Sequence, residues 1–292
     1  MRNKNLIGTG VALITPFNDD FSIDFLSLEK LIENMIENRV NYLVVMGTTA
    51  ESPTLSSEEQ IDILNFVKKI VNNRVPIVFG MGSNDTNKLL KRIKNFDFDG
   101  IEAILSVCPY YNKPNQTGLF SHFDTIAMNC PVDIILYNVP SRTSSNLDFN
   151  TVKDLSNKHR NIIGIKEASG DIGFAMDLFL NCPKDFMIIS GDDKITYPMI
   201  ALGGAGVISV QAMAFPNLFV KMVDCSLSSD FMLARSYHYE LLKSVDLFYI
   251  DGNPAGIKEA LFFKNICRTN QLRLPLTKMK KENALLLHKF LK

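Results

Sequence analysis

The segment Ile162-Ile163-Gly164-Ile165-Lys166-Glu167-Ala168-Ser169-Gly170-Asp171 passes from a short apolar run to a lysine and then to a polar turn ahead of a helical pattern. A run of this length followed by a helix is typical of a buried strand in an α/β unit. Lys166 ends that strand, where burial would favour its neutral amine, a form that can attack a carbonyl and give a Schiff base. Lys166 is therefore the candidate nucleophile. The alternative is a lysine whose side chain reaches from the strand end to water.

Seven further strand-like runs alternate with helical patterns along the chain, at residues 11–14, 42–46, 76–79, 101–107, 132–137, 186–190 and 206–210. Ser56 and Glu59 have the spacing of a capping box at the start of one helix. Eight apolar strands that alternate with helices predict a parallel sheet covered by helices. At 292 residues we expect the α/β class and a closed (β/α)8 TIM barrel.

The strand pattern stops beyond about Ser226, and residues 233–247, 255–267 and 280–290 have helical patterns instead. We therefore expect two parts, a catalytic barrel over residues 1–225 and a C-terminal helical segment over residues 226–292. The glycine-rich pieces at 80–82 and 203–206 lack the G-x-G-x-x-G spacing of a dinucleotide-binding turn.

Composition excludes several classes of partner. The formal net charge is zero, with 46% hydrophobic and 21% charged residues, which is typical of a soluble globular protein and leaves no electrostatic case for nucleic acid or an anionic membrane. No apolar stretch is long enough for a membrane span, and the N-terminus has no signal-peptide pattern, so we expect a cytoplasmic protein. The five cysteines and four histidines are scattered, so we expect neither disulfides nor a metal site.

Several expected strands end in reactive side chains. Strand two ends at Thr48 and Thr49, whose hydroxyls and backbone amides could hold a carboxylate; the alternative is an ordinary threonine-rich turn. Tyr111 and Tyr137 follow or end two other strands, where tyrosines are more often packing residues. A Tyr-Thr-Tyr relay could pass the protons of a Schiff-base reaction without histidine or metal. Arg142 suits bidentate binding of a second carboxylate, unless it forms a surface ion pair.

Five motifs in order along nearly the whole chain together resemble the dihydrodipicolinate synthase family, in the N-acetylneuraminate lyase superfamily of class I pyruvate aldolases. They are Gly47-Thr48-Thr49-x-Glu51-Ser52, Pro109-Tyr110-Tyr111-Asn112-Lys113-Pro114, Tyr137-Asn138-Val139-Pro140-Ser141-Arg142-Thr143, Gly164-Ile165-Lys166-Glu167-Ala168-Ser169-Gly170 and Ser190-Gly191-Asp192-Asp193. The resemblance implies a lyase that condenses pyruvate with L-aspartate 4-semialdehyde in the diaminopimelate route of lysine biosynthesis, without a cofactor.

The resemblance also implies a role for each matching catalytic residue. Lys166 would form the Schiff base and Tyr137 would give and take protons, with Thr48 and Tyr111 completing the relay. In this family the tyrosine at position 111 enters the active site of a neighbouring subunit. A homo-oligomer is therefore implied, with a dimer as the working unit and usually a tetramer of two dimers.

Four further positions match the family's substrate-binding residues. Thr49 and the backbone at Ile208 would hold pyruvate, Gly191 would lie near the carbonyl group, and Arg142 would bind the carboxylate of the semialdehyde. Sugar-acid lyases of the same scaffold, such as N-acetylneuraminate lyase or a 2-keto-3-deoxy sugar acid aldolase, generally lack this arginine. They remain the alternative, with a non-catalytic binding or regulatory barrel as a further one.

Two positions depart from the family's usual glycines. Ala50 follows the two threonines, and Ser144 follows Arg142 and Thr143. If Ala50 must adopt a positive φ, it would be strained by roughly 1 kcal/mol or more.

The positions that bind the inhibitor lysine in feedback-regulated relatives are also altered. Two histidines are replaced by Ser57 and Gln60, and Lys88 stands where an acidic residue binds the inhibitor's amine. Ser52, Asn84 and Tyr110 remain. Because a like charge repels, we expect this allosteric site to be degraded and the enzyme to be insensitive to L-lysine.

Overall fold

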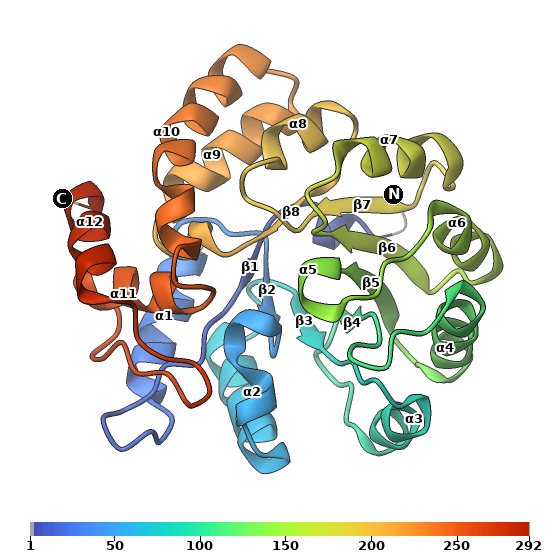
Figure 1. Cartoon of the computed structure of the whole chain (residues 1–292), viewed down its shortest axis with the longest axis horizontal. Helices are drawn as coiled ribbons and strands as arrows, with labels where there is room; N and C mark the ends of the chain where they lie inside the picture. The colour runs from blue at the N-terminus through green and yellow to red at the C-terminus, as the bar shows by residue number, and fades with distance from the viewer. Residues whose placement is uncertain (1–2, 292) are drawn as a thin grey trace.

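The computed structural model describes residues 3–291 and confirms the closed barrel (Figure 1). All neighbouring strands are parallel, in the order β1 to β8, and β8 pairs with β1 to close the ring. The strands are β1 (Gly8–Ala12), β2 (Tyr42–Val45), β3 (Ile77–Gly80), β4 (Ala103–Val107), β5 (Asp133–Asn138), β6 (Ile162–Glu167), β7 (Met187–Ser190) and β8 (Gly206–Ser209). Each of the eight expected strands is present.

Helices surround the barrel, as expected for a sheet buried on both faces. They are α1 (Phe25–Glu37), α2 (Ser57–Val71), α3 (Thr86–Asn95), α4 (Gln116–Asn129), α5 (Pro140–Thr143), α6 (Phe149–Lys158), α7 (Ile172–Asn181), α8 (Thr196–Ala201), α9 (Pro216–Leu227), α10 (Phe231–Tyr249), α11 (Ala255–Phe263) and α12 (Lys281–Leu291). Short 3-10 turns are η1 (Lys4–Leu6), η2 (Thr48–Ala50), η3 (Ser52–Thr54) and η4 (Gln211–Met213). The expected capping box of Ser56 and Glu59 opens α2 with both of its hydrogen bonds.

Apolar side chains form two cores. One fills the inside of the barrel and includes Val44, Val78 and Ile135. The other lies between the strands and the helices and includes Leu31 and Val67. Because each strand contributes to both cores, its sequence is apolar almost throughout, and that pattern is why the strands could be recognised.

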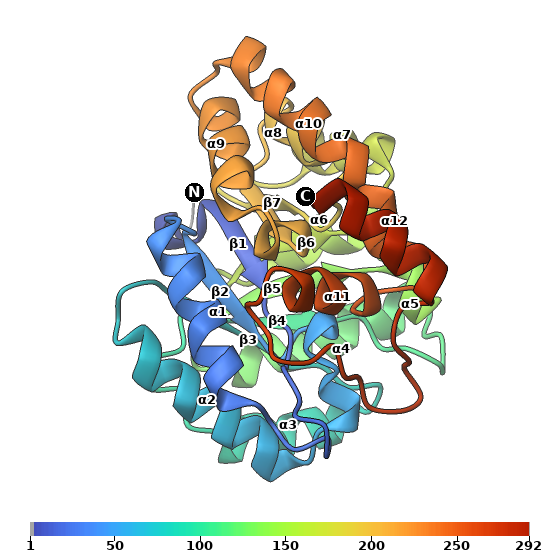
Figure 2. The same ribbon diagram turned by 90° about the vertical axis from the view of Figure 1, so that its left-hand side faces the viewer.

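The C-terminal helices gather along one side of the barrel, where α10 packs on α9, and α10, α11 and α12 contact one another (Figures 1 and 2). The helix expected over 255–267 ends earlier, at Phe263. Asn265 there adopts a left-handed φ of 56°, and the amide of Ile266 bonds back to Leu261 O at 2.9 Å. This turn stops the helix. The division at residue 225 stays a prediction.

Strain does not fall on Ala50. Ala50 belongs to η2, and the positive φ lies one residue later, at Glu51 (φ 56°). Ser144, by contrast, does adopt φ 56° at the end of α5, which explains why a glycine suits that position.

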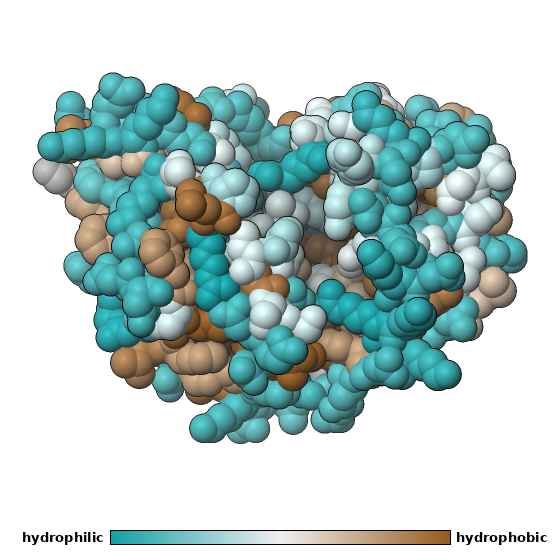
Figure 3. Space-filling view, turned by 60° about the horizontal axis from the view of Figure 1, so that its bottom comes forward, coloured by the Kyte–Doolittle hydropathy of each residue, from teal (hydrophilic) through white to brown (hydrophobic). Residues whose placement is uncertain are grey.

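The described residues, 3–291, contain no helix that is both long and apolar enough to cross a membrane. The face in Figure 3 is mostly hydrophilic, with its apolar residues in separate patches and a hollow near the middle.

A buried histidine links two of the outer helices. His122 on α4 is 4% exposed, and its Nδ1 lies 2.8 Å from Oγ1 of Thr86 at the start of α3. Its Nε2 has no partner among the described residues. Burial lowers the pKa of His122 from 6.5 to about 4, so the folded protein holds the ring neutral.

We expect His122 to make the fold less stable as pH falls from 7 to 5. The unfolded chain takes up this proton near pH 6.5 and the folded protein only near pH 4, so the stability present above pH 6.5 is lost on acidification. The loss from this residue is about 2 kcal/mol over that range. Urea unfolding at both pH values measures the loss, with His122→Asn as the control. An equally steep pH dependence in that variant would contradict the prediction.

Candidate active site

A β-bulge sets the direction of the Lys166 side chain. The pairing of β5 with β6 shifts between Ile134 and Ile135, which face Ile162 and Gly164, so Ile163 is an extra residue on β6. Ile163 packs inside the barrel, whereas Ile162 and Ile165 pack toward the helices. The bulge therefore restarts the alternation of side chains and turns Lys166 into the barrel mouth, a use of bulges that is common beside active sites.

Lys166 lies beside Tyr137 on the neighbouring strand. The two residues are paired in register, each is 6% exposed, and the Lys166 Nζ lies 4.4 Å from the centre of the tyrosine ring. Gly191 at the end of β7 leaves room for this lysine, because a Cβ there would stand 2.9 Å from Lys166 Cε and 2.6 Å from Ala168 Cβ. Any side chain at position 191 would displace the amine.

These residues surround a cavity of about 300 Å³ at the carboxyl ends of the strands, where TIM barrels carry their active sites. Among the expected site residues, the structure brings five to this cavity: Thr49, Tyr137, Arg142, Lys166 and Gly191. The other lining residues are Val139, Ser141, Ala168, Asp192, Lys194, Val210, Val245, Asp246, Tyr249 and Asn253.

Three expected residues do not line this cavity. Thr48 precedes Thr49 in the same 3-10 turn. Ile208 lies on β8, 1% exposed, two residues before the cavity-lining Val210. Tyr111 is 89% exposed, on a loop beyond β4.

Asn138, the last residue of β5, holds the loop that carries Arg142. Its Nδ2 donates to Glu167 Oε2 and to Asn146 Oδ1, both at 2.8 Å, and its Oδ1 accepts from Leu147 N at 3.1 Å. Burial raises the pKa of Glu167, whereas the hydrogen bond from Asn138 lowers it. Arg142 itself forms no ion pair with any residue between 3 and 291, so its guanidinium is free to bind an anion.

The loop of Tyr111 is strained. Tyr111 has φ 74°, and Asn112 N donates to Tyr110 O at 2.9 Å, which makes a tight γ-turn of the uncommon hand. Asn112 Nδ2 also donates to Asn84 O at 2.9 Å. A bulky residue in this region costs of order 1–3 kcal/mol and indicates a functional constraint.

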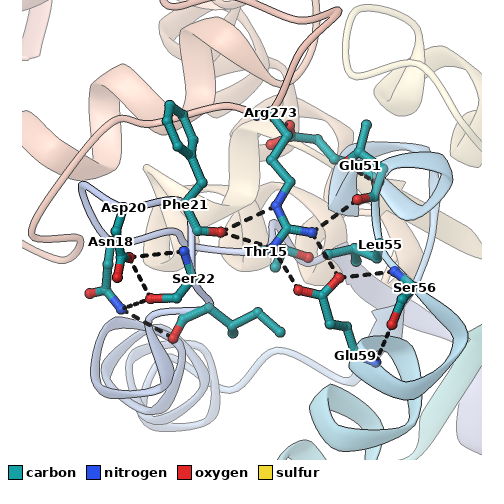
Figure 4. A network of polar contacts seen from close by, with 12 residues as sticks. Thr15, Asn18, Asp20, Phe21, Ser22, Glu51, Leu55, Ser56, Glu59 and Arg273 are labelled. Atoms are coloured by element: carbon teal, nitrogen blue, oxygen red, sulfur yellow. Dashed lines mark hydrogen bonds and ion pairs between the residues drawn. The ribbon is translucent and has the colours of Figure 1, made fainter.

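Residues of the C-terminal segment anchor the stretch that follows the two threonines, and Figure 4 shows the contacts of Arg273 with Glu51 and Glu59. Glu51, 1% exposed, forms a buried ion pair with Lys258 of α11 and accepts a 3.0 Å bond from the Arg273 backbone amide. The Arg273 guanidinium binds Glu59 with both terminal nitrogens, at 2.7 and 2.6 Å. It also donates to Thr54 O at 2.9 Å. None of these residues lines the cavity, so the turn is held by residues outside it.

Sequence reasoning missed the contribution of α10 and the residues after it. Tyr249 donates its hydroxyl to Asp193 Oδ2 at 3.2 Å, and the same oxygen accepts from Gln211 N at 2.8 Å. Burial of its hydroxyl group and the nearby Asp193 raise the pKa of Tyr249 well above 10.0, so the hydroxyl remains a donor. Lys194 forms an ion pair with Asp246 at the cavity edge. Only spatial proximity reveals these residues.

The altered positions on α2 and α3 are partly engaged within the protein. Gln60 donates to Ser52 O at 3.0 Å and accepts from Arg92 Nη2 at 2.6 Å. Ser57 and Lys88 are exposed. Among residues 3–291, no three or more histidine, cysteine or acidic side chains lie together where they could hold a metal.

Comparisons with known proteins agree with this geometry. The sequence model of the Dihydrodipicolinate synthetase family matches residues 5–292. The chain is 47% identical over 276 residues to a 4-hydroxy-tetrahydrodipicolinate synthase from Karelsulcia muelleri, covering 94% of this chain and 93% of that protein. The crystal structure of dihydrodipicolinate synthase from Aquifex aeolicus has a TM-score of 0.94 at 36% identity, covering 98% of this chain and 97% of that one.

A second crystal structure is similar over 98% of both chains, with a TM-score of 0.94 at 34% identity. It is the chloride-inhibited dihydrodipicolinate synthase from Acinetobacter baumannii complexed with pyruvate. Fold and sequence thus agree over nearly the whole chain. The chain belongs to the dihydrodipicolinate synthetase family.

Proposed function

We propose that this cavity condenses pyruvate with L-aspartate 4-semialdehyde through a Schiff base on Lys166. Membership of the family supports the activity of a 4-hydroxy-tetrahydrodipicolinate synthase. This enzyme is a lyase of lysine biosynthesis with a class I aldolase mechanism. The observation that carries the mechanism is the position of Lys166. Its Nζ is shielded from water and lies 4.4 Å from the Tyr137 ring inside the cavity.

The steps need one nucleophile and a path for protons. The Lys166 amine attacks C2 of pyruvate, and the carbinolamine loses water to give the imine. Loss of a methyl proton gives the enamine, whose carbon attacks the aldehyde carbon while the aldehyde oxygen takes up a proton. The amine of the semialdehyde then attacks the imine carbon, which closes the ring and releases the Lys166 amine. Tyr137, next to the amine, is the proposed carrier of these protons, with Thr48 and Tyr111 completing the relay.

Substrate groups are assigned by charge and by donor geometry. Thr49 and the backbone at Ile208 are proposed to hold pyruvate, with Gly191 near its carbonyl group. Arg142, which lines the same cavity and has no acidic partner among the described residues, is proposed to bind the carboxylate of the semialdehyde. This arginine favours the synthase over a sugar-acid lyase, whose substrate presents hydroxyl groups instead.

We also infer a homo-oligomer, with a dimer or a tetramer of two dimers as the working form. Tyr111 is 89% exposed in a strained turn, and in one chain it stands outside the cavity. A second copy of the chain would give this side chain a site in which to act, which would account for the strain.

Trapping of the imine tests the proposal. Borohydride reduction with pyruvate is expected to add the reduced pyruvate group at Lys166, seen by mass spectrometry of the peptide. In Arg142→Ala the trapping should persist, because pyruvate binding does not use Arg142, whereas condensation with the semialdehyde should fall by about 100-fold or more, as for loss of a charged hydrogen-bond partner. Lys166→Met is the negative control. Equal loss of trapping and condensation in Arg142→Ala would contradict the role given to Arg142.

We expect the enzyme to be insensitive to L-lysine. Gln60 is engaged with Ser52 and Arg92, and Lys88 presents a like charge to the inhibitor's amine. Initial rates at saturating pyruvate should therefore be the same with and without millimolar L-lysine. Strong inhibition in that assay would show that the site still binds the amino acid.

A further inference from the structure

Asn253 reaches the threonine turn from a distant part of the chain. It lies between α10 and α11, and its Nδ2 donates to Thr49 Oγ1 at 3.0 Å across 204 positions of sequence. Both residues line the cavity. The Asn253 Oδ1 is buried and has no hydrogen-bond partner among residues 3–291.

This contact decides what the Thr49 hydroxyl can do. A threonine hydroxyl has one proton to donate and accepts through its lone pairs. Because Asn253 fills an acceptor position, the hydroxyl proton must point elsewhere. Thr49 is 3% exposed and its hydroxyl donates to no described residue, so the cavity is where its proton can find an acceptor.

The opposite orientation of the amide is less favourable. It would bring Asn253 Oδ1 to Thr49 and use up the hydroxyl proton. It would also place the amide N–H₂ where Oδ1 now lies buried without a partner. Buried donors without partners are rarer in proteins than under-satisfied carbonyl oxygens, so the observed orientation is the better one.

We propose that Asn253 is a positioning residue that holds the Thr49 hydroxyl as a hydrogen-bond donor to the carboxylate of pyruvate. The proposal rests on the function assigned above, since it takes pyruvate as the molecule bound beside Thr49. It also makes the segment after α10 part of the substrate site. Asn253 acts only through Thr49.

An isosteric substitution tests the proposal. In Asn253→Asp the carboxylate is acceptor-only, so it takes the Thr49 proton and places a negative charge near the pyruvate carboxylate. The KM for pyruvate should rise about 10- to 100-fold at pH 8, with a much smaller change in kcat. The ratio of KM between variant and unaltered enzyme should fall toward one as pH is lowered and the new aspartate is protonated. Because the new charge also repels pyruvate directly, the same change is made in Thr49→Val, where the rise in KM caused by Asn253→Asp should be smaller because the hydroxyl is absent.

Asn253→Ala removes the donor without adding charge, so its KM for pyruvate should rise by less and its ratio should not change with pH. Asn253→Ala also tests the proposal if Asn253→Asp fails to fold. A KM for pyruvate in Asn253→Ala equal to that of the unaltered enzyme would overturn the proposal. Asn95→Asp, an exposed position at the end of α3, is the matched control for the change in net charge.

Two further results would overturn the inference while leaving the proposed function intact. One is a folded Asn253→Asp whose KM for pyruvate is unchanged at every pH. The other is a fall in kcat and a rise in KM that do not depend on pH, together with a lowered melting temperature. Borohydride trapping distinguishes failure of the inference about Asn253 from failure of the proposed function, because an unaltered enzyme that forms no imine at Lys166 would refute the function itself.

Discussion

The buried ion pair of Glu51 and Lys258 is the contact on which the geometry of this site depends. Both side chains are almost fully buried, and Lys258 also lies 4.2 Å from the Phe17 ring centre and donates to Gln271 O at 2.8 Å. Removing one partner of such a pair leaves an uncompensated buried charge, which costs about 3–5 kcal/mol. Because Glu51 follows Thr49 by two residues, the same pair fixes the threonine turn. The C-terminal helices are therefore part of the site.

The bulge in β6 is the second constraint, and it sets the direction of the Lys166 side chain. In a strand of regular alternation, Ile163 and Lys166 would face opposite sides of the sheet. The extra residue lets Ile163 fill the barrel interior while Lys166 still faces the mouth. Gly191 then gives the lysine its space, and Tyr137 gives it a partner. Position, space and partner come from three neighbouring strands, so the nucleophile is held by the barrel and not by a loop.

The sequence alone was sufficient for the strands and for the strand-end residues Lys166, Tyr137, Thr49 and Arg142, because each strand is apolar and barrel chemistry gathers where strands end. It was insufficient for Asn253, Tyr249 and the bulge. Asn253 and Tyr249 reach the cavity through packing of helices that follow the last strand, and no periodicity encodes that packing. The bulge replaces no residue and leaves the apolar run unbroken. Asn265 was likewise missed as the end of α11, because a left-handed asparagine has no periodic signal.

The backbone shows where the chain tolerates strain for the sake of the site. Among the described residues with a positive φ, Arg39, Asn72, Ser229 and Asn265 follow helix ends, where a left-handed residue commonly ends a helix. Phe21 lies in the loop after β1, and a second group, Met46, Glu51, Tyr111, Lys113 and Ser144, lies in the segments that follow β2, β4 and β5, with Ser144 at the end of the short helix α5. None of the second group is a glycine, so each carries a cost of order 1–3 kcal/mol that packing must offset. The segments after β2, β4 and β5 carry Thr49, Tyr111 and Arg142, so part of the backbone strain falls on the segments that place the groups proposed to bind substrate and move protons.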